Sequence, residues 1–124
     1  ERAHLANRSN GDIFVSIHSN FHPNPEIQGL EVYHYKNLST SGLLAKKIEA
    51  RMAQYMSIPT LGVKVNDFAV IRETMMPSVL VELGYLSNTR EENIMSSVAF
   101  KDSAALGIFR GIVDYFYESN RKEP

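Results

Sequence analysis

Two short apolar runs constrain the fold of this chain more than any other feature. Residues 12–18 (DIFVSIH) and 78–83 (SVLVEL) are rich in β-branched side chains, which favour strands. Both runs are apolar at successive positions, as strands are when helices cover both faces of their sheet. We therefore predict that both segments are central strands of a sheet that has a helical layer on each side.

Shorter patterns add two strands and a loop. Residues 30–35 (LEVYHY) alternate between apolar and polar side chains, and residues 67–72 (DFAVIR) form a short β-branched run, so we expect a strand in each. Residues 19–29 contain two prolines and a glycine between these strand patterns, which predicts a loop.

Helical patterns occupy most of the remaining chain. Residues 1–7 read as the last turns of a helix, so we expect the natural polypeptide to extend upstream. Residues 40–56 carry apolar side chains three and four positions apart, and Thr89 and Glu92 fit the capping box that begins a short helix. Strands alternating with helices predict an α/β fold with three layers, in which a mostly parallel or mixed twisted sheet has helices on both faces.

The longest helix is expected over residues 99–117, with a polar tail over residues 119–124. Its apolar side chains recur at helical spacing and predict one buried face. Small residues form a line along the helix surface beside this buried face, and they would let the helix approach a sheet closely. The predicted buried face is Ala105, Ile108, Phe109, Ile112 and Phe116, and the line of small residues is Ala104, Gly107 and Gly111.

Composition excludes several kinds of function. Thirteen Lys and Arg residues against fourteen Asp and Glu residues give a net charge of −1, so the chain has no global basic field for nucleic acid or an anionic membrane. No apolar run approaches the roughly 20 residues that a membrane-spanning helix needs. Because cysteine is absent, disulfides, thiolate catalysis and cysteine zinc sites are excluded. A chain of 124 residues is expected to form one domain.

Two polar residues are hard to explain by stability alone. His18 ends the first apolar run, and Glu82 interrupts the second, where a desolvated carboxylate is costly unless it is compensated. Ligands of open α/β sheets bind beyond the carboxyl ends of the strands, so both side chains are expected to converge on one crevice. The structural alternatives are an ordinary strand-end histidine and a Glu82 that pairs with Arg72.

Polar residues flank His18 on both sides. Ser16, Ser19 and Asn20 could orient its ring through hydrogen bonds, or they could be ordinary polar residues at a strand end. Among the other histidines, only His22 lies near enough in sequence to matter.

Five motifs follow one another along the chain and together carry a resemblance. They are AN at residues 6–7, DIFVSIHSN at 12–20, GLEVY at 29–33, VIR at 70–72 and MPSVLVELGYLSN at 76–88. This sequence resembles the zinc-dependent N-acetylmuramoyl-L-alanine amidases, the bacterial cell-wall hydrolases of the autolysin and cell-separation type. The resemblance extends from the first residue to about residue 116.

The resemblance implies roles for particular residues. His18 is the histidine of the SIH motif and would bind Zn²⁺, and Glu82 of the VELG motif would be the catalytic carboxylate. Ser16, Ser19, Asn20 and Arg72 would orient the site or face the substrate. The family has two further zinc ligands, a His in an early GHG-type motif and a Glu between that motif and the SIH strand, and neither motif occurs here. We therefore expect residues 1–118 to be the C-terminal part of a catalytic domain whose first strand lies upstream.

The implied activity is hydrolysis of the amide bond between N-acetylmuramic acid and L-alanine in peptidoglycan. The family works in cell-wall turnover, autolysis or cell separation. The location would be extracytoplasmic: secreted, periplasmic or cell-wall associated. Wall-binding domains or activator proteins would lie outside this chain, and the 124 residues alone should be inactive. The alternatives are a metal-free relative that acts as a cell-wall-binding or regulatory module, and another zinc hydrolase such as a carboxypeptidase, against which the VELGYLSN segment argues.

Overall fold

The computed structural model describes residues 1–36 and 39–121, and their strands form one mixed sheet in the order β1-β4-β2-β3. Strand β1 runs parallel to β4, β2 runs parallel to β3, and β2 is antiparallel to β4. The strands are β1 (Phe14–Asn20), β2 (Leu30–His34), β3 (Thr60–Val65) and β4 (Ser78–Tyr85). The helices are α1 (Arg2–Arg8), α2 (Ser39–Tyr55), α3 (Ala69–Arg72), α4 (Thr89–Met95) and α5 (Val98–Arg121).

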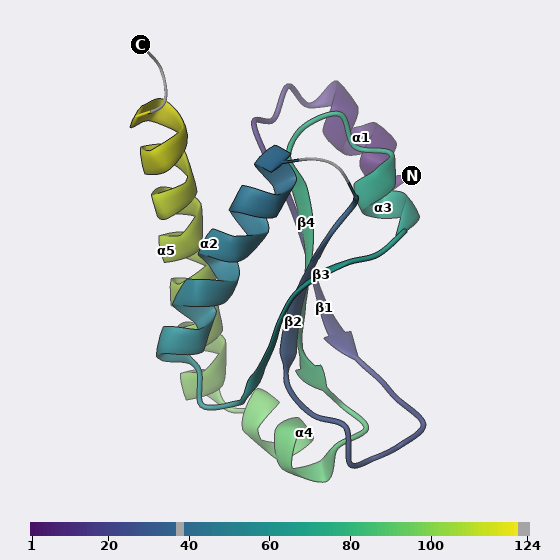
Figure 1. Cartoon of the computed structure of the whole chain (residues 1–124). Helices are drawn as coiled ribbons and strands as arrows, with labels where there is room; N and C mark the ends of the chain where they lie inside the picture. The colour runs from purple at the N-terminus through teal and green to yellow at the C-terminus, as the bar shows by residue number, and fades with distance from the viewer. Residues whose placement is uncertain (37–38, 122–124) are drawn as a thin grey trace.

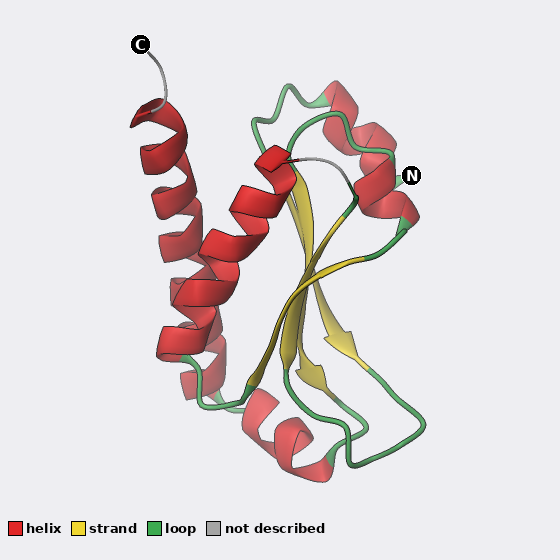
Figure 2. Cartoon of the chain, viewed as in Figure 1, coloured by secondary structure: helices red, strands yellow, loops and turns green. Residues whose placement is uncertain are grey.

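Helices surround this sheet, which confirms the predicted α/β fold with a mixed sheet. Helices α2 and α5 lie side by side against one face, and α1 and α3 lie together on the other side, near the start of β1 and β4 (Figures 1 and 2). Helix α4 follows the carboxyl end of β4. The opposite face of the sheet is therefore covered at one end, and the carboxyl ends of β1 and β4 lie at the other.

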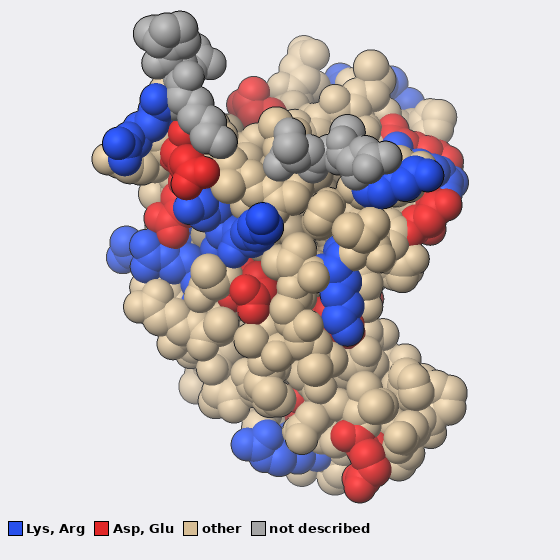
Figure 3. Space-filling view, viewed as in Figure 1, with Lys and Arg blue, Asp and Glu red and all other residues tan. Residues whose placement is uncertain are grey.

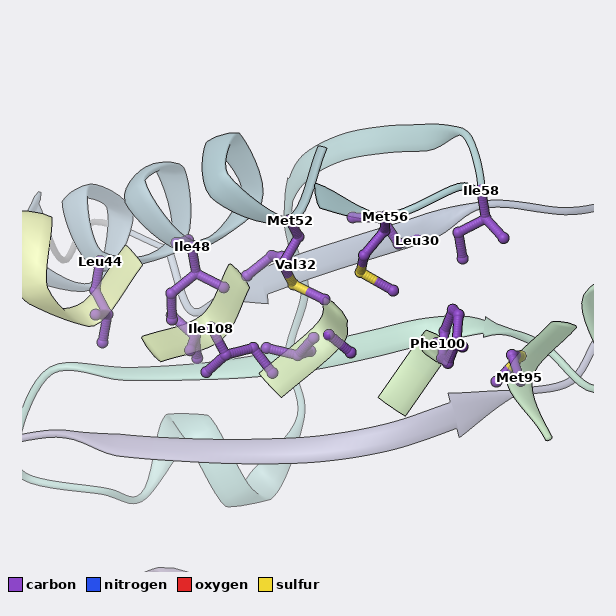
Figure 4. Packing of buried hydrophobic residues seen from close by; sticks show 14 of the residues in the cluster. Leu30, Val32, Leu44, Ile48, Met52, Met56, Ile58, Met95, Phe100 and Ile108 are labelled. Atoms are coloured by element: carbon purple, nitrogen blue, oxygen red, sulfur yellow. The ribbon is translucent and has the colours of Figure 1, made fainter. Parts of the chain in front are cut away.

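The main core lies between the sheet and the pair formed by α2 and α5 (Figure 4). The predicted stripe of α2 is confirmed, because Leu44, Ile48 and Met52 are all fully buried. Burying each such side chain stabilises the fold by roughly 1.5–3 kcal/mol. The strand residues that share this core are Leu30, Val32, Val79 and Val81.

Helix α5 differs from the predicted helix in its length and in its buried face. It continues to Arg121, so the predicted polar tail begins inside the helix, and residues 122–124 lie outside the described part of the chain. Phe109 is 59% exposed and Ala105 is also exposed, although the sequence predicts both on the buried face. The buried residues of α5 are Phe100, Ala104, Gly107, Ile108, Gly111 and Tyr115.

The line of small residues on α5 faces a helix and not a sheet. A Cβ atom placed on Gly111 would lie 2.4 Å from Cα of Ile48, and one on Gly107 would lie 2.9 Å from Cα of Met52. Both distances are too short for any side chain, so the backbones of α5 and α2 pack in direct contact. The prediction of a close approach was right, but its partner is α2.

Strand β1 is an edge strand within the described residues, where it pairs with β4 alone. The prediction that residues 12–18 form a central strand is therefore wrong for this structure, and it is confirmed for β4, which lies between β1 and β2. Ile17 shows the consequence, because its side chain is 54% exposed despite its β-branched character. An apolar run indicates a strand, but it does not reveal how many neighbours that strand has.

Two elements between residues 59 and 72 were not anticipated. Strand β3 (TLGVKV) was not recognised, because it is largely exposed and is interrupted by Gly62, which has a positive φ of 93°. The segment predicted as a strand over residues 67–72 forms instead the single turn of α3, in which Ile71 is fully buried. A helical turn of four residues is too short to show a hydrophobic period.

Helix α4 begins with a cap that differs from the predicted one. Asn88 is the N-cap, and its Oδ1 accepts a hydrogen bond from the backbone N–H of Glu91 at 3.0 Å. The Glu91 carboxylate then accepts from the backbone N–H of Tyr85 at 2.8 Å. Gly84 makes this contact possible, since it has a φ of 156° and a Cβ there would lie 3.1 Å from the Glu91 carboxylate. The cap therefore fixes the end of β4.

No helix among the described residues is long and apolar enough to span a membrane. Figure 3 shows basic and acidic side chains interspersed on the viewed face, without a large field of one sign. This distribution agrees with the net charge of −1.

Candidate active site

A row of polar side chains crosses the sheet on the face opposite to α2. Parallel pairing places His18 of β1 next to Glu82 of β4, and antiparallel pairing places Glu82 next to Glu31 of β2. Partner residues on neighbouring strands point to the same face, whereas the adjacent Val81 and Val32 point into the core. His18, Glu82 and Glu31 are therefore neighbours on one surface.

His18 is held by a side chain from its own strand. Nε2 of His18 lies 2.7 Å from Oγ of Ser16, which is two residues away and on the same face. Ser16 is only 7% exposed, so its position is fixed by the surrounding structure. This hydrogen bond orients the imidazole ring and leaves Nδ1 for another partner.

Glu82 is a half-buried residue whose carboxylate has one unsatisfied oxygen. Its Oε1 is buried and has no hydrogen-bond partner within the described residues. Burial, followed by the negative charge of Glu31, raises the pKa of Glu82 to about 7. A partly desolvated carboxylate with a raised pKa is costly for stability and is typical of functional sites.

Arg72 does not neutralise Glu82. Its guanidinium pairs with Asp67 and lies 3.0 Å from the Glu73 carboxylate, within and beside α3. The structural alternative considered above, an ion pair between Glu82 and Arg72, is therefore absent from the described part of the structure.

Glu31 is the third member of the row, and sequence reasoning missed it. Its side chain is only 2% exposed, and its carboxylate accepts hydrogen bonds from four neighbours. Burial opposes ionisation, but the hydrogen bonds from Lys64, Tyr85 and Tyr33 outweigh it and lower the pKa of Glu31. The donors are Tyr85 Oη at 2.7 Å, Lys64 Nζ at 2.8 Å, Tyr33 Oη at 2.9 Å and Asn20 Nδ2 at 3.4 Å. Only the strand register could have revealed Glu31, because its sequence pattern is that of any alternating strand.

The remaining predicted site residues divide between the two faces. Asn20 reaches Glu31 and so belongs to the polar row. Ser19 points to the opposite face, where it lines an apolar hollow with Ile17 and residues of α5. His22 packs its ring edge against Tyr85, with 6.3 Å between the ring centroids.

The chemistry of the row can be compared with that of a zinc site. Imidazole is a common zinc ligand, and a buried unpartnered carboxylate oxygen beside it suits a site at which a proton is moved. However, no group of three or more His, Cys, Asp or Glu residues that could hold a metal ion occurs in residues 1–36 and 39–121. His18 therefore fits as one zinc ligand of an otherwise incomplete set.

Comparison with known proteins links this geometry to one family. The profile of the N-acetylmuramoyl-L-alanine amidases matches residues 1–114. An uncharacterised cell wall amidase of Bacillus anthracis is 36% identical over 124 residues, which cover 94% of this chain and 23% of that protein. The N-acetylmuramoyl-L-alanine amidase LytC of Bacillus subtilis is 33% identical over 118 residues, which cover 94% of this chain and 24% of LytC.

Solved structures show the same fold. An N-acetylmuramoyl-L-alanine amidase from Clostridium difficile 630 has a TM-score of 0.90 and 33% identity, covering 93% of this chain and 63% of that one. The Clostridioides difficile CwlD amidase, in complex with the GerS lipoprotein, has a TM-score of 0.88 and 28% identity, covering 94% and 60% of the two chains. The chain thus spans about a quarter of the two curated relatives and less than two thirds of these structures.

Proposed function

Because this chain belongs to the N-acetylmuramoyl-L-alanine amidase family, we propose that it hydrolyses the amide bond between N-acetylmuramic acid and L-alanine in peptidoglycan, as part of a complete catalytic domain. One observation supports a role for residues of this chain in that reaction. His18 and Glu82 are register partners on one face of the sheet, and the Glu82 carboxylate has a buried oxygen without a partner in the described structure.

Glu82 is the proposed acid and base of the reaction. Its carboxylate takes a proton from the attacking water and later donates a proton to the nitrogen of the leaving L-alanine. A pKa of about 7 suits both steps near neutral pH, because the group then exchanges protons readily in either direction. The hydrogen-bonded Glu31 keeps its own charge and stays out of this exchange.

Zinc is the proposed cofactor. His18 would contribute one ligand, and the Ser16 hydroxyl would fix the ring that presents it. The two further ligands, a His and a Glu, are proposed to lie outside these 124 residues. When bound, zinc would polarise the scissile carbonyl and make the attacking water more acidic.

Other predicted residues have different roles in this proposal. Asn20 helps to hold Glu31 and so supports the row. Ser19 and Arg72 receive no role in the site, because Ser19 lies on the other face and Arg72 pairs with Asp67 and Glu73.

The proposed substrate places the protein outside the cytoplasm, whether secreted, periplasmic or associated with the cell wall. Wall-binding domains or activator proteins would act from outside this chain. The complex between CwlD and the GerS lipoprotein supports the idea that a family member has a protein partner.

The identity of the cleaved bond tests the proposed function. The complete domain, meaning these residues together with the proposed further ligands, is incubated with purified peptidoglycan, and the products are analysed by mass spectrometry. We expect free stem peptides that begin with L-alanine. Cleavage at another bond would support a different hydrolase, such as a carboxypeptidase. Binding to peptidoglycan without any cleavage would support the metal-free binding module.

A further inference from the structure

The polar row continues onto the fourth strand through a basic residue. Lys64 of β3 is the register partner of Tyr33 and lies on the same face as Glu31. Its Nζ is 2.8 Å from Oε2 of Glu31. The row therefore runs from His18 through Glu82 and Glu31 to an ammonium group at its far end.

Glu31 has little capacity left to bind anything else. Each of its two oxygens accepts from two donors, and its side chain is 2% exposed. Tyr33, one of these donors, is itself fixed by edge-to-face packing on Phe68, with 5.2 Å between the ring centroids. A ligand arriving at this end of the row cannot use Glu31 as its acceptor.

Lys64 does have capacity left. An ammonium group has three N–H donors, and the ion pair with Glu31 uses one of them, while the Lys64 side chain is 45% exposed. The buried carboxylate thus holds a half-exposed cation in place. An ordered side chain loses less conformational entropy when it binds a ligand. These features suit the binding of an anion from solution.

The distance between Lys64 and Glu82 across the sheet indicates which anionic group of a substrate could reach Lys64. Neighbouring strands lie about 4.8 Å apart, so Lys64 is roughly 10 Å from Glu82 across the sheet. An extended peptide advances about 3.4 Å per residue, so two residues and a short side chain cover that distance. An acidic residue that follows L-alanine in the stem peptide would bring its carboxylate to Lys64.

We propose that Lys64 binds a carboxylate of the residue that follows L-alanine in the stem peptide. This inference rests on the proposed function and names a recognition element of the same site. Arg72, the cation on α3, forms ion pairs with two carboxylates, Asp67 and Glu73, whereas Lys64 pairs with Glu31 alone among the described contacts. The competing explanation is that Lys64 only neutralises the charge of Glu31.

A matched pair of substrates separates the two explanations. One is N-acetylmuramoyl-L-alanyl-glutamate, and the other is the same compound with its carboxylates converted to carboxamides. The kcat/KM of the complete, zinc-loaded domain is measured on both compounds for the wild type and for Lys64→Met. Lys64→Arg retains the charge, and Lys46→Met removes an exposed charge on α2 as a control.

The wild type should favour the acidic compound by about fivefold to tenfold, as expected for a charge-assisted hydrogen bond at a half-exposed site. Lys64→Met should abolish that preference mainly through KM, whereas Lys64→Arg and Lys46→Met should keep it. If Lys64→Met slows both compounds equally, the inference is wrong and Lys64 only compensates Glu31. If the wild type cleaves neither compound, the proposed function itself fails, and the inference fails with it.

Discussion

Glu82 lies in an environment that is unfavourable to its ionised form. Its carboxylate is partly desolvated, lacks a partner for Oε1 within the described residues, and lies next to the charged Glu31. Arg72 would have been an effective counter-ion, but it is engaged elsewhere. These features agree with the proposed role of Glu82, in which the carboxylate accepts and releases a proton.

Replacing the Glu82 carboxylate by a neutral group should stabilise the protein. Glu82→Gln has nearly the same shape and removes the charge repulsion with Glu31. We expect a gain on the order of 1 kcal/mol at neutral pH, seen as a rise of a few degrees in Tm. Differential scanning calorimetry measures it, with Glu92→Gln, an exposed residue of α4, as the control. A clear loss of stability would show that Glu82 has a favourable partner.

His18 should be required for zinc. In the complete domain, His18→Ala removes one of the proposed protein ligands, so bound zinc should fall well below one ion per chain. Ser16→Ala should weaken zinc binding by about 10–100-fold, because the ring loses its orienting hydrogen bond. Elemental analysis and competition with a chelator measure both effects. His4→Ala, on the exposed face of α1, should bind zinc like the wild type, and full zinc in His18→Ala would contradict the ligand assignment.

At the scale of elements, the sequence predicted a helix or strand correctly where the apolar residues follow a clear helical or strand pattern. The stripe of Leu44, Ile48 and Met52 predicted α2, and the dense apolar run with Glu82 predicted β4. The prediction that β1 is central was wrong, since pairing partners are set by residues far away in the sequence. The roles of Glu31 and Lys64 were hidden for the same reason, because each depends on strand register.

Among the contacts between elements, the contact between α2 and α5 can be tested most directly by mutation. Gly111→Ala places a methyl group where Cα of Ile48 is only 2.4 Å away, so the helices must separate. We expect a loss of about 1–3 kcal/mol, as for other overpacked cores. Chemical denaturation measures it. Gly42→Ala is a matched control in α2, because its Cβ would meet only the His34 ring at 3.4 Å, and alanine favours a helix by about 1 kcal/mol.

One outcome of this comparison would contradict the close packing of α2 and α5. If Gly111→Ala is as stable as Gly42→Ala, the two helices do not pack in backbone contact. The close approach inferred from Ala104, Gly107 and Gly111 would then be wrong in its partner as well as in its distance.

At the scale of the whole molecule, residues 1–36 and 39–121 place the proposed metal ligand His18 and the proposed catalytic carboxylate Glu82 side by side on one face of the sheet. The family assignment agrees with the proposed roles of these two residues, and the proposal expects further zinc ligands from outside the 124 residues. Within the described residues, strand β1, which carries His18, pairs with β4 alone. Further residues of the proposed metal site can therefore approach His18 from the free edge of β1.

The 124-residue chain by itself should be folded but inactive. With one of three proposed ligands, it should bind less than one zinc ion per chain and release no stem peptide from peptidoglycan. Circular dichroism verifies that the chain is folded, and elemental analysis and a release assay measure the two outcomes. Turnover by this chain with added zinc would mean that other residues complete the site, and His22 beside Tyr85 and His34 would be examined first.

The central claim is that Glu82 performs the proton transfers of an amidase. The most direct measurement is the rate of stem-peptide release by Glu82→Gln in the complete domain, relative to the wild type at equal zinc content. We predict that the variant retains its zinc and loses activity by about 10²–10⁴-fold, the usual contribution of a general acid and base. Near-normal turnover by a variant that carries its full zinc would contradict the account and make Glu82 a structural residue.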